Sequence, residues 1–215
     1  MAASNNRKTI VVFAKAPVPG EVKTRLTPFL SEASAADLHR RLVVHTLQTI
    51  TQLTDCFIEL WVGSEHDWWT ELAERFAVPV YRQRGNDLGE RMSYALDKAL
   101  QGSKQVLIVG TDCPDITPQY LQRAFDSVEQ QGVVIGPADD GGYVLLGLRQ
   151  PMPWLFNDMR WGGDSIFATT VARMEEKGVS WFELQPLMDI DRPEDFIRLQ
   201  QLRPNLTEGL SVNGT

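Results

Sequence analysis

The chain has 215 residues, of which 43% are hydrophobic and 23% are charged, and its formal net charge is −7. This length and composition are typical of a globular protein with one sizeable core. The negative net charge argues against broad electrostatic binding of nucleic acid or of an anionic membrane surface.

Hydrophobic patterning predicts strands that alternate with helices along most of the chain. The predicted strands are residues 9–14, 56–62, 78–81, 105–110, 133–136, 143–148 and 181–184, and the predicted helices are 31–53, 67–76, 88–100, 117–130, 164–177 and 193–202. The strands at 133–136 and 143–148 are too close for a helical crossover, so one of them is expected to run antiparallel. The pattern predicts an α/β fold with a mixed, mostly parallel sheet and helices on both faces.

We expect a single domain over residues 9–203, with a flexible N-terminus at 1–8 and a flexible polar tail at 204–215. Two cysteines, Cys56 and Cys113, are too few for a disulfide framework, and neither belongs to a Cys-x-x-Cys pair. The first residues lack the apolar core of a signal peptide, and no apolar run approaches the length that spans a bilayer. We therefore expect a cytoplasmic protein with reduced thiols that binds neither nucleic acid nor membrane.

A basic loop follows the first predicted strand. The segment Lys15–Arg25 contains two prolines and Gly20, which bend the backbone and can present N–H groups to an anion. Lys15, Lys23 and Arg25 add three positive charges, which suits a di- or triphosphate. We predict that Lys15, Gly20, Lys23 and Arg25 bind nucleotide phosphates and that Lys23 is also catalytic. The alternative is a rigid turn with solvated lysines.

A polar loop enters the helix predicted at 88–100. The N-terminus of a helix can bind phosphate or a polar group of a base, so Gln83, Gly85 and Arg91 are predicted nucleotide contacts. Asp87 has the alternative role of capping this helix.

Two aspartates follow the apolar strand at 105–110. Ligands in open α/β sheets bind outside the carboxyl ends of such strands, where Asp112 stands. A carboxylate that faces phosphates needs a cation between them, and Mg²⁺ uses one or two carboxylates plus substrate phosphates. We predict that Asp112 is catalytic and binds this metal. The alternative is that Asp112 and Asp115 organise the turn, and Cys113 is expected to be a small packing residue.

Two further acidic segments are candidates. Asp139 and Asp140 precede two glycines between neighbouring strands, so they are predicted catalytic residues that close over a substrate, with a tight turn as the alternative. Asp189 and Asp191 alternate along the chain, so an extended backbone points both the same way. Their alternative role is to lead into the helix at 193–202.

Four other polar or aromatic residues are interpreted as structural. Trp161 is expected to pack, with a position beside an acceptor as the alternative. His39, His45 and His66 show no metal-ligand spacing and are interpreted as structural or surface residues.

Taken together, the five segments described above resemble the nucleotide-diphospho-sugar transferase superfamily, which has a glycosyltransferase-A-like fold. The motifs that carry the resemblance are Phe13–Leu26, Gly110–Pro114, Asp139–Tyr143 and Asp189–Asp195. The closer likeness is to a bacterial glycosyltransferase-like family associated with radical-SAM and selenodomain gene neighbourhoods, and it covers about residues 9–202. The chain departs from related guanylyltransferases in lacking a Gly-Gly start to the first loop.

The resemblance implies a three-layer, Rossmann-like nucleotide-binding half and an acceptor side formed by the C-terminal half. It also implies a metal-binding aspartate at Asp112 and further metal carboxylates at Asp189 and Asp191. We therefore expect a transferase that depends on Mg²⁺ or Mn²⁺ and uses a nucleotide or nucleotide-sugar and a small-molecule acceptor.

The group transferred remains open at this point. The basic loop slightly favours nucleotidyl transfer to a phosphorylated acceptor, because a triphosphate needs more positive charge. The resemblance favours glycosyl transfer from a nucleotide-diphospho-sugar. A non-catalytic nucleotide-binding protein is the third alternative. Neither the base nor the oligomeric state is indicated by the sequence.

Overall fold

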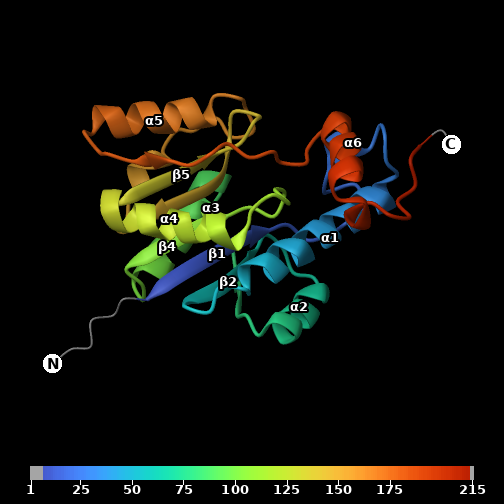
Figure 1. The fold of residues 1–215 in the computed structure, drawn as a ribbon, viewed down its shortest axis with the longest axis horizontal. Helices are drawn as coiled ribbons and strands as arrows, with labels where there is room; N and C mark the ends of the chain where they lie inside the picture. Colours follow the sequence, from blue (N-terminus) through green and yellow to red (C-terminus); the bar gives the residue numbers. More distant parts are fainter. Residues whose placement is uncertain (1–6, 214–215) are drawn as a thin grey trace.

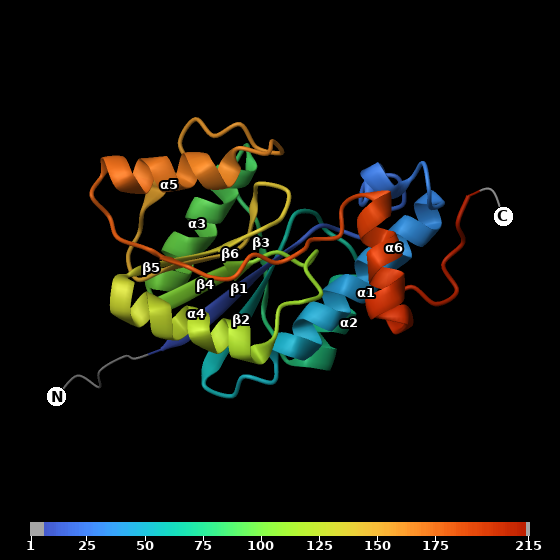
Figure 2. The ribbon, with the colours of Figure 1, turned by 45° about the horizontal axis from the view of Figure 1, so that its top comes forward.

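The computed structural model describes residues 7–213 as a seven-stranded sheet between two layers of helices (Figures 1 and 2). The strands are β1 (Lys8–Ala14), β2 (Cys56–Val62), β3 (Val80–Arg82), β4 (Gln105–Val109), β5 (Val133–Pro137), β6 (Tyr143–Leu148) and β7 (Phe182–Glu183). The helices are α1 (Glu32–Ile50), α2 (Trp68–Phe76), α3 (Leu88–Leu100), α4 (Pro118–Gln131), α5 (Ile166–Glu176) and α6 (Pro193–Leu202). Three short 3₁₀ turns, η1 (Thr24–Leu26), η2 (Pro153–Leu155) and η3 (Pro204–Leu206), complete the chain.

The sheet has the order β3-β2-β1-β4-β6-β5-β7. Strand β6 runs antiparallel to both of its neighbours, β4 and β5, whereas the other pairs are parallel. The predicted α/β class and the mixed, mostly parallel sheet are therefore confirmed. The sequence did not predict the 3₁₀ turns, because three residues are too few to show a helical repeat of apolar side chains.

Each face of the sheet is buried under its own layer of helices. One apolar cluster joins α1, α2 and α4 to the first face, with Leu47, Leu72 and Phe125 fully buried. A second cluster joins α3 and α5 to the opposite face through Met92, Met174 and their neighbours. Strand β4 is the central strand of the seven and is buried at all five of its residues. Its carboxyl end therefore lies at the middle of the sheet edge.

A third apolar cluster lies at one end of the molecule, where α6 covers the N-terminal half of α1 and the loop after β1 (Figure 1). Leu26 of the loop, Leu38 of α1 and Ile190 are all fully buried in it. Phe196 of α6 packs edge-on against Phe29, with ring centroids 5.7 Å apart. This cluster holds the loop after β1 next to the segment that leads into α6.

The segment after α6 is packed as far as residue 213. Leu206 is buried, Val212 forms a β-bridge with Leu30, and the Asn213 N–H donates to the Phe29 carbonyl. The sequence predicted a flexible tail here, and its last two residues, 214–215, lie outside the described residues. Of the predicted N-terminal flexible segment, residues 1–6 also lie outside them, whereas Lys8 is already in β1. None of the helices formed by residues 7–213 combines the length and apolarity needed to cross a membrane.

We expect Gly147→Ala to destabilise the fold by about 1–3 kcal/mol because it overpacks the core. A Cβ atom at Gly147 would lie 2.5 Å from a methyl group of Leu107, 2.6 Å from one of Val134 and 2.7 Å from one of Val128. Gly102→Ala is the matched control, since the nearest atom to its Cβ would be a carbonyl oxygen 4.0 Å away. Urea unfolding checks both, and equal stability of the two variants would contradict the packing argument.

Candidate functional site

Lys23 joins three segments that are far apart in the sequence. Its side chain is only 4% exposed, and its Nζ lies 2.6 Å from Asp112 Oδ1. The same Nζ donates to the Ile190 carbonyl at 2.5 Å, and the Ile190 N–H donates to the Asp112 carbonyl at 2.8 Å. Lys23 itself has a left-handed backbone, with φ of 51°. The loop after β1, the end of β4 and the segment before α6 therefore meet at one ammonium group.

Asp112 presents one buried oxygen and one that can meet a ligand. Its side chain is 49% exposed, but Oδ1 is buried between Lys23 and His39, whose Nδ1 lies 3.9 Å away. Burial opposes ionisation, but the Lys23 charge and the adjacent His39 outweigh it and hold the pKa of Asp112 well below its usual value. Asp112 is therefore a carboxylate at neutral pH, with Oδ2 left as the accessible oxygen.

His39 connects α1 to the basic loop. Its Nε2 lies 2.9 Å from the Lys15 carbonyl oxygen, which can only accept, so Nε2 donates. Nδ1 is buried and has no hydrogen-bond partner among residues 7–213. Sequence reasoning missed this link, since a histidine without ligand spacing is usually structural. The available signal was that His39 lies at helical spacing from Ala35, Leu42 and Thr46, which form a buried stripe of α1.

Three carboxylates line a cavity of about 160 Å³ at the carboxyl end of β4, namely Asp112, Asp140 and Asp189. We call this cavity the carboxylate pocket. Asp140 belongs to the turn between β5 and β6, where its Oδ1 accepts from the Gly142 N–H at 2.8 Å. Burial, followed by the negative charges of Asp140 and Asp112, raises the pKa of Asp189 to about 6. Negative charge is thus concentrated here beyond what the neighbouring cations neutralise.

The predicted metal ligands divide into two groups. Asp112 and Asp189 line the carboxylate pocket, whereas Asp191 forms an ion pair with Arg25 and does not line it. Within residues 7–213, no three His, Cys, Asp or Glu side chains form a set that could hold a metal ion. The two remaining carboxylates still fit Mg²⁺, which takes one or two of them and completes its coordination with substrate phosphates and water. The metal site stays a prediction.

The three predicted phosphate-binding cations have different surroundings. Lys15 is exposed, Lys23 is buried against Asp112, and Arg25 pairs with Asp191, whose hydrogen bond and charge raise the pKa of Arg25. Gly20 has φ of 81°, a conformation that favours glycine, so the bend expected in this loop is present. Lys15 is the cation of this set that can reach a ligand without breaking an ion pair.

The predicted nucleotide contacts after β3 are partly engaged with the protein. Gln83 donates from its side chain to the Trp61 carbonyl at 2.9 Å, and its backbone N–H donates to Val62. Gly85 has φ of 140°, and a Cβ there would lie 2.5 Å from the side chain of Glu90. Arg91 donates to the Gly85 carbonyl at 3.1 Å. The loop is therefore held rigidly beside the first turn of α3.

Asp87 caps α3 by accepting the Glu90 N–H at 2.8 Å. Asp139 is exposed and does not line the carboxylate pocket. Asp115 accepts from Arg203 at 2.9 Å, so it helps to hold the segment after α6.

Burial raises the pKa of the Cys113 thiol to about 12, which suits a packing residue better than a nucleophile.

Similarity to a solved structure places this chain in the nucleotide-diphospho-sugar transferase superfamily. Its structure superposes on that of a candidate nucleotide-diphospho-sugar transferase from Desulfovibrio desulfuricans G20 with a TM-score of 0.83. The two chains are 31% identical, and the match covers 94% of this chain and 89% of that chain. Residues 46–163 match the family described as "Uncharacterized protein conserved in bacteria (DUF2064)", and the chain belongs to this family. The resemblance predicted from the motifs is confirmed at the level of the superfamily.

Two curated relatives are 2-phospho-L-lactate guanylyltransferases. The relative from Methanobrevibacter smithii is 28% identical over 123 residues, which make up 57% of this chain and 54% of that protein. The relative from Methanothermobacter thermautotrophicus is 26% identical over 160 residues, which make up 74% of this chain and 68% of that protein. The chain therefore spans about half the length of the first relative and about two thirds of the second.

We expect Lys23→Met to lower the free energy of unfolding by about 1–3 kcal/mol, because the Ile190 carbonyl and Asp112 Oδ1 lose a buried partner. Lys15→Met is the matched control in the same loop, and its exposed side chain should contribute within about 0.5 kcal/mol. Urea unfolding at neutral pH measures both. Two variants of equal stability would show that Lys23 is not a structural link.

We expect His39→Leu to destabilise by about 1–3 kcal/mol, since it leaves the Lys15 carbonyl without its donor. His39→Gln should retain most of the stability, because a glutamine amide can donate from nearly the position of Nε2. Thermal or urea unfolding of both variants tests the hydrogen bond. If the glutamine variant is as unstable as the leucine variant, the hydrogen bond to the Lys15 carbonyl does not explain the contribution of His39 to stability.

Proposed function

We propose that this protein is a nucleotidyltransferase that transfers a nucleoside monophosphate group to a phosphorylated small molecule and requires Mg²⁺ or Mn²⁺. The names of the two curated relatives support nucleotidyl transfer. Because those matches cover only part of each relative, their base and acceptor are not carried over to this chain.

The observation on which the proposal rests is the carboxylate pocket. Asp112 is held ionised by Lys23, while burial, followed by the negative charges of Asp140 and Asp112, raises the pKa of Asp189 to about 6. A divalent cation at these two residues would relieve that repulsion and would allow phosphates to approach an acidic protein. The loop after β1 reaches Asp112 of this pocket through Lys23, and Lys15 of the same loop is exposed.

In the proposed reaction, an oxygen of the acceptor's phosphate attacks the α-phosphorus of a nucleoside triphosphate. A phosphorus–oxygen bond forms, the bond between the α-phosphorus and the bridging oxygen breaks, and pyrophosphate leaves with the electron pair. A bound Mg²⁺ would supply positive charge to the phosphate oxygens.

The side chains of this chain have separate tasks in that reaction. Lys23 orients Asp112 by pairing with Oδ1, which leaves Oδ2 as the accessible oxygen. We assign Lys15 to the leaving phosphates, since its charge is not used by an ion pair. Arg25 holds Asp191, and so we assign it to positioning the segment before α6.

Glycosyl transfer is the second candidate, and the similarity to the Desulfovibrio protein favours it. In that reaction an acceptor hydroxyl attacks the sugar carbon, and a nucleoside diphosphate leaves. Asp139 or Asp140 would accept the hydroxyl proton. The two reactions release different products, so one assay separates them.

We expect pyrophosphate release from a nucleoside triphosphate and a phosphorylated acceptor only when Mg²⁺ or Mn²⁺ is present. Asp112→Asn and Asp189→Asn should each lower kcat/KM by more than about 100-fold, because each removes charge that holds the metal. Asp126→Asn, at an exposed position on α4, is the matched control and should leave the rate unchanged. Release of nucleoside diphosphate from a nucleotide-sugar would assign glycosyl transfer instead. Nucleotide binding without turnover would indicate the non-catalytic alternative.

A further inference from the structure

A second cavity adjoins the carboxylate pocket and has a different character. It has a volume of about 200 Å³, and none of its lining residues is charged. The two cavities share the wall formed by Gly110 and by Gly142, Tyr143 and Val144 of the β6 region. A molecule with its charged group in the carboxylate pocket can therefore extend directly into an apolar space.

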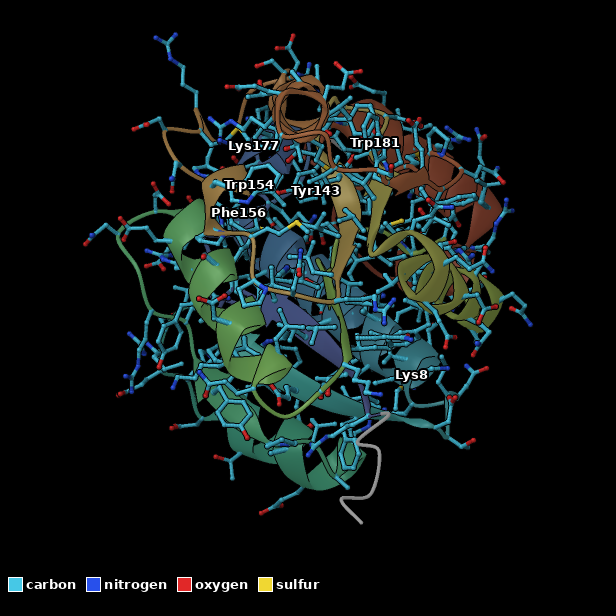
Figure 3. The ribbon with its side chains drawn as sticks, turned by 90° about the vertical axis from the view of Figure 1, so that its left-hand side faces the viewer. Lys8, Tyr143, Trp154, Phe156, Lys177 and Trp181 are labelled. Carbon is cyan, nitrogen blue, oxygen red and sulfur yellow. The ribbon has the colours of Figure 1, made fainter. Side chains whose placement is uncertain are left out.

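Side chains from the sheet and from the layer of helices formed by α3 and α5 line this apolar cavity. Phe13 of β1, Ile108 of β4, Met92 of α3 and Ile166 of α5 line it. Figure 3 shows Tyr143 with Trp154 and Phe156 in the layer between α3 and α5, and the same three residues belong to or pack against the second apolar cluster. An apolar cavity of about 150 Å³ can hold a benzene ring, so this cavity is large enough for a ring or a short alkyl chain.

Two features of the cavity wall point to a ligand. Leu88, the first residue of α3, is 42% exposed although it lines the cavity. Trp161 also lines it, and its indole Nε1 is buried without a hydrogen-bond partner in the part of the chain that the structure describes. An unpaired buried donor costs about 1–3 kcal/mol. Trp161 therefore lines the cavity although its unpaired indole N–H lowers the stability of the fold.

Position 89 determines where that wall stands. A Cβ at Gly89 would lie 2.6 Å from Trp161 Cζ2 and 2.9 Å from its Nε1, so the indole packs directly on the backbone of α3. Trp161 is also stacked on Phe156, with ring centroids 6.4 Å apart. Because residue 89 is helical, alanine suits its backbone better than glycine, and the glycine is explained by the space that Trp161 needs.

We propose that this cavity binds an apolar group of the acceptor, an alkyl or aryl chain attached to the phosphate that enters the carboxylate pocket. The assignment rests on the proposed function. A nucleobase is the less suitable occupant, since its polar edge would face walls whose polar side-chain atoms are limited to the phenol of Tyr143 and the indole of Trp161.

Binding of simple phosphates by calorimetry, in the presence of Mg²⁺, tests this assignment without requiring turnover. The probes are methyl, ethyl, propyl, butyl and phenyl phosphate. We expect the dissociation constant to fall by about fourfold for each added methylene group, with a negative heat-capacity change. Equal affinity for methyl and butyl phosphate would overturn the proposal.

Three variants test whether the alkyl chain of the probe lies in the cavity. Leu88→Ser should reduce the dependence of the dissociation constant on the length of this chain. Ile197→Ser is the matched control, because Ile197 of α6 has the size of leucine and is 45% exposed, and it should leave this dependence unchanged. Gly89→Ala should weaken the binding of butyl phosphate, because its Cβ displaces Trp161 from the cavity wall. If Leu88→Ser weakens a nucleoside triphosphate and leaves butyl phosphate unaffected, the cavity is a base site and the proposal is wrong.

The two proposals fail separately. Graded binding of alkyl phosphates without pyrophosphate release from any nucleoside triphosphate would support the cavity and refute nucleotidyl transfer. Pyrophosphate release that is equally fast with methyl and butyl phosphate, together with equal affinities, would support transfer and refute the cavity.

Discussion

The buried ion pair between Lys23 and Asp112 is the contact on which the rest of the site depends. One ammonium group satisfies Asp112 Oδ1 and the Ile190 carbonyl, while the Ile190 N–H returns to the Asp112 carbonyl. Burying a lysine is costly unless it is fully paired. Lys23 is fully paired only when the loop after β1, the end of β4 and the segment before α6 are all in place. The geometry of the site is therefore coupled to the packing of α6 on α1.

This coupling also explains how an acidic protein can keep a concentrated negative site. Two of the three cations of the basic loop neutralise aspartates of the protein, Lys23 with Asp112 and Arg25 with Asp191. They fix the acidic segments but form no ion pair with Asp140 or Asp189 among the described residues, and burial followed by the charges of Asp140 and Asp112 raises the pKa of Asp189. The loop thus contributes mainly to building the carboxylate pocket. The divalent cation of the proposed function would supply the positive charge that the phosphates of a ligand need there.

Much of the fold was predictable, because strands buried on both faces and amphipathic helices leave clear local patterns. The position of Asp112 followed from the same reasoning, since a strand's carboxyl end locates its next residues. The partners of these residues were not predictable. Nothing in the local sequence distinguishes Lys23, which is buried, from Lys15, which is exposed in the same loop. The burial of Lys23 depends on the packing of the third apolar cluster. The roles of His39 and of Asp191 likewise depend on contacts more than 20 and 160 residues away in sequence.

The arrangement of the two cavities follows from the antiparallel strand β6. Because β6 reverses direction beside β4, the turn before it brings Asp140 and two glycines to the carboxyl end of the central strand. That turn carries polar backbone and a carboxylate toward one cavity, while Tyr143 begins the apolar strand that borders the other. Gly141 lets the same turn pack against the segment before α5, since a Cβ there would lie 2.0 Å from the Asp164 carbonyl oxygen. A charged pocket and an apolar pocket are thus placed side by side by one strand reversal, and this is the arrangement that the proposed recognition of an amphipathic acceptor requires.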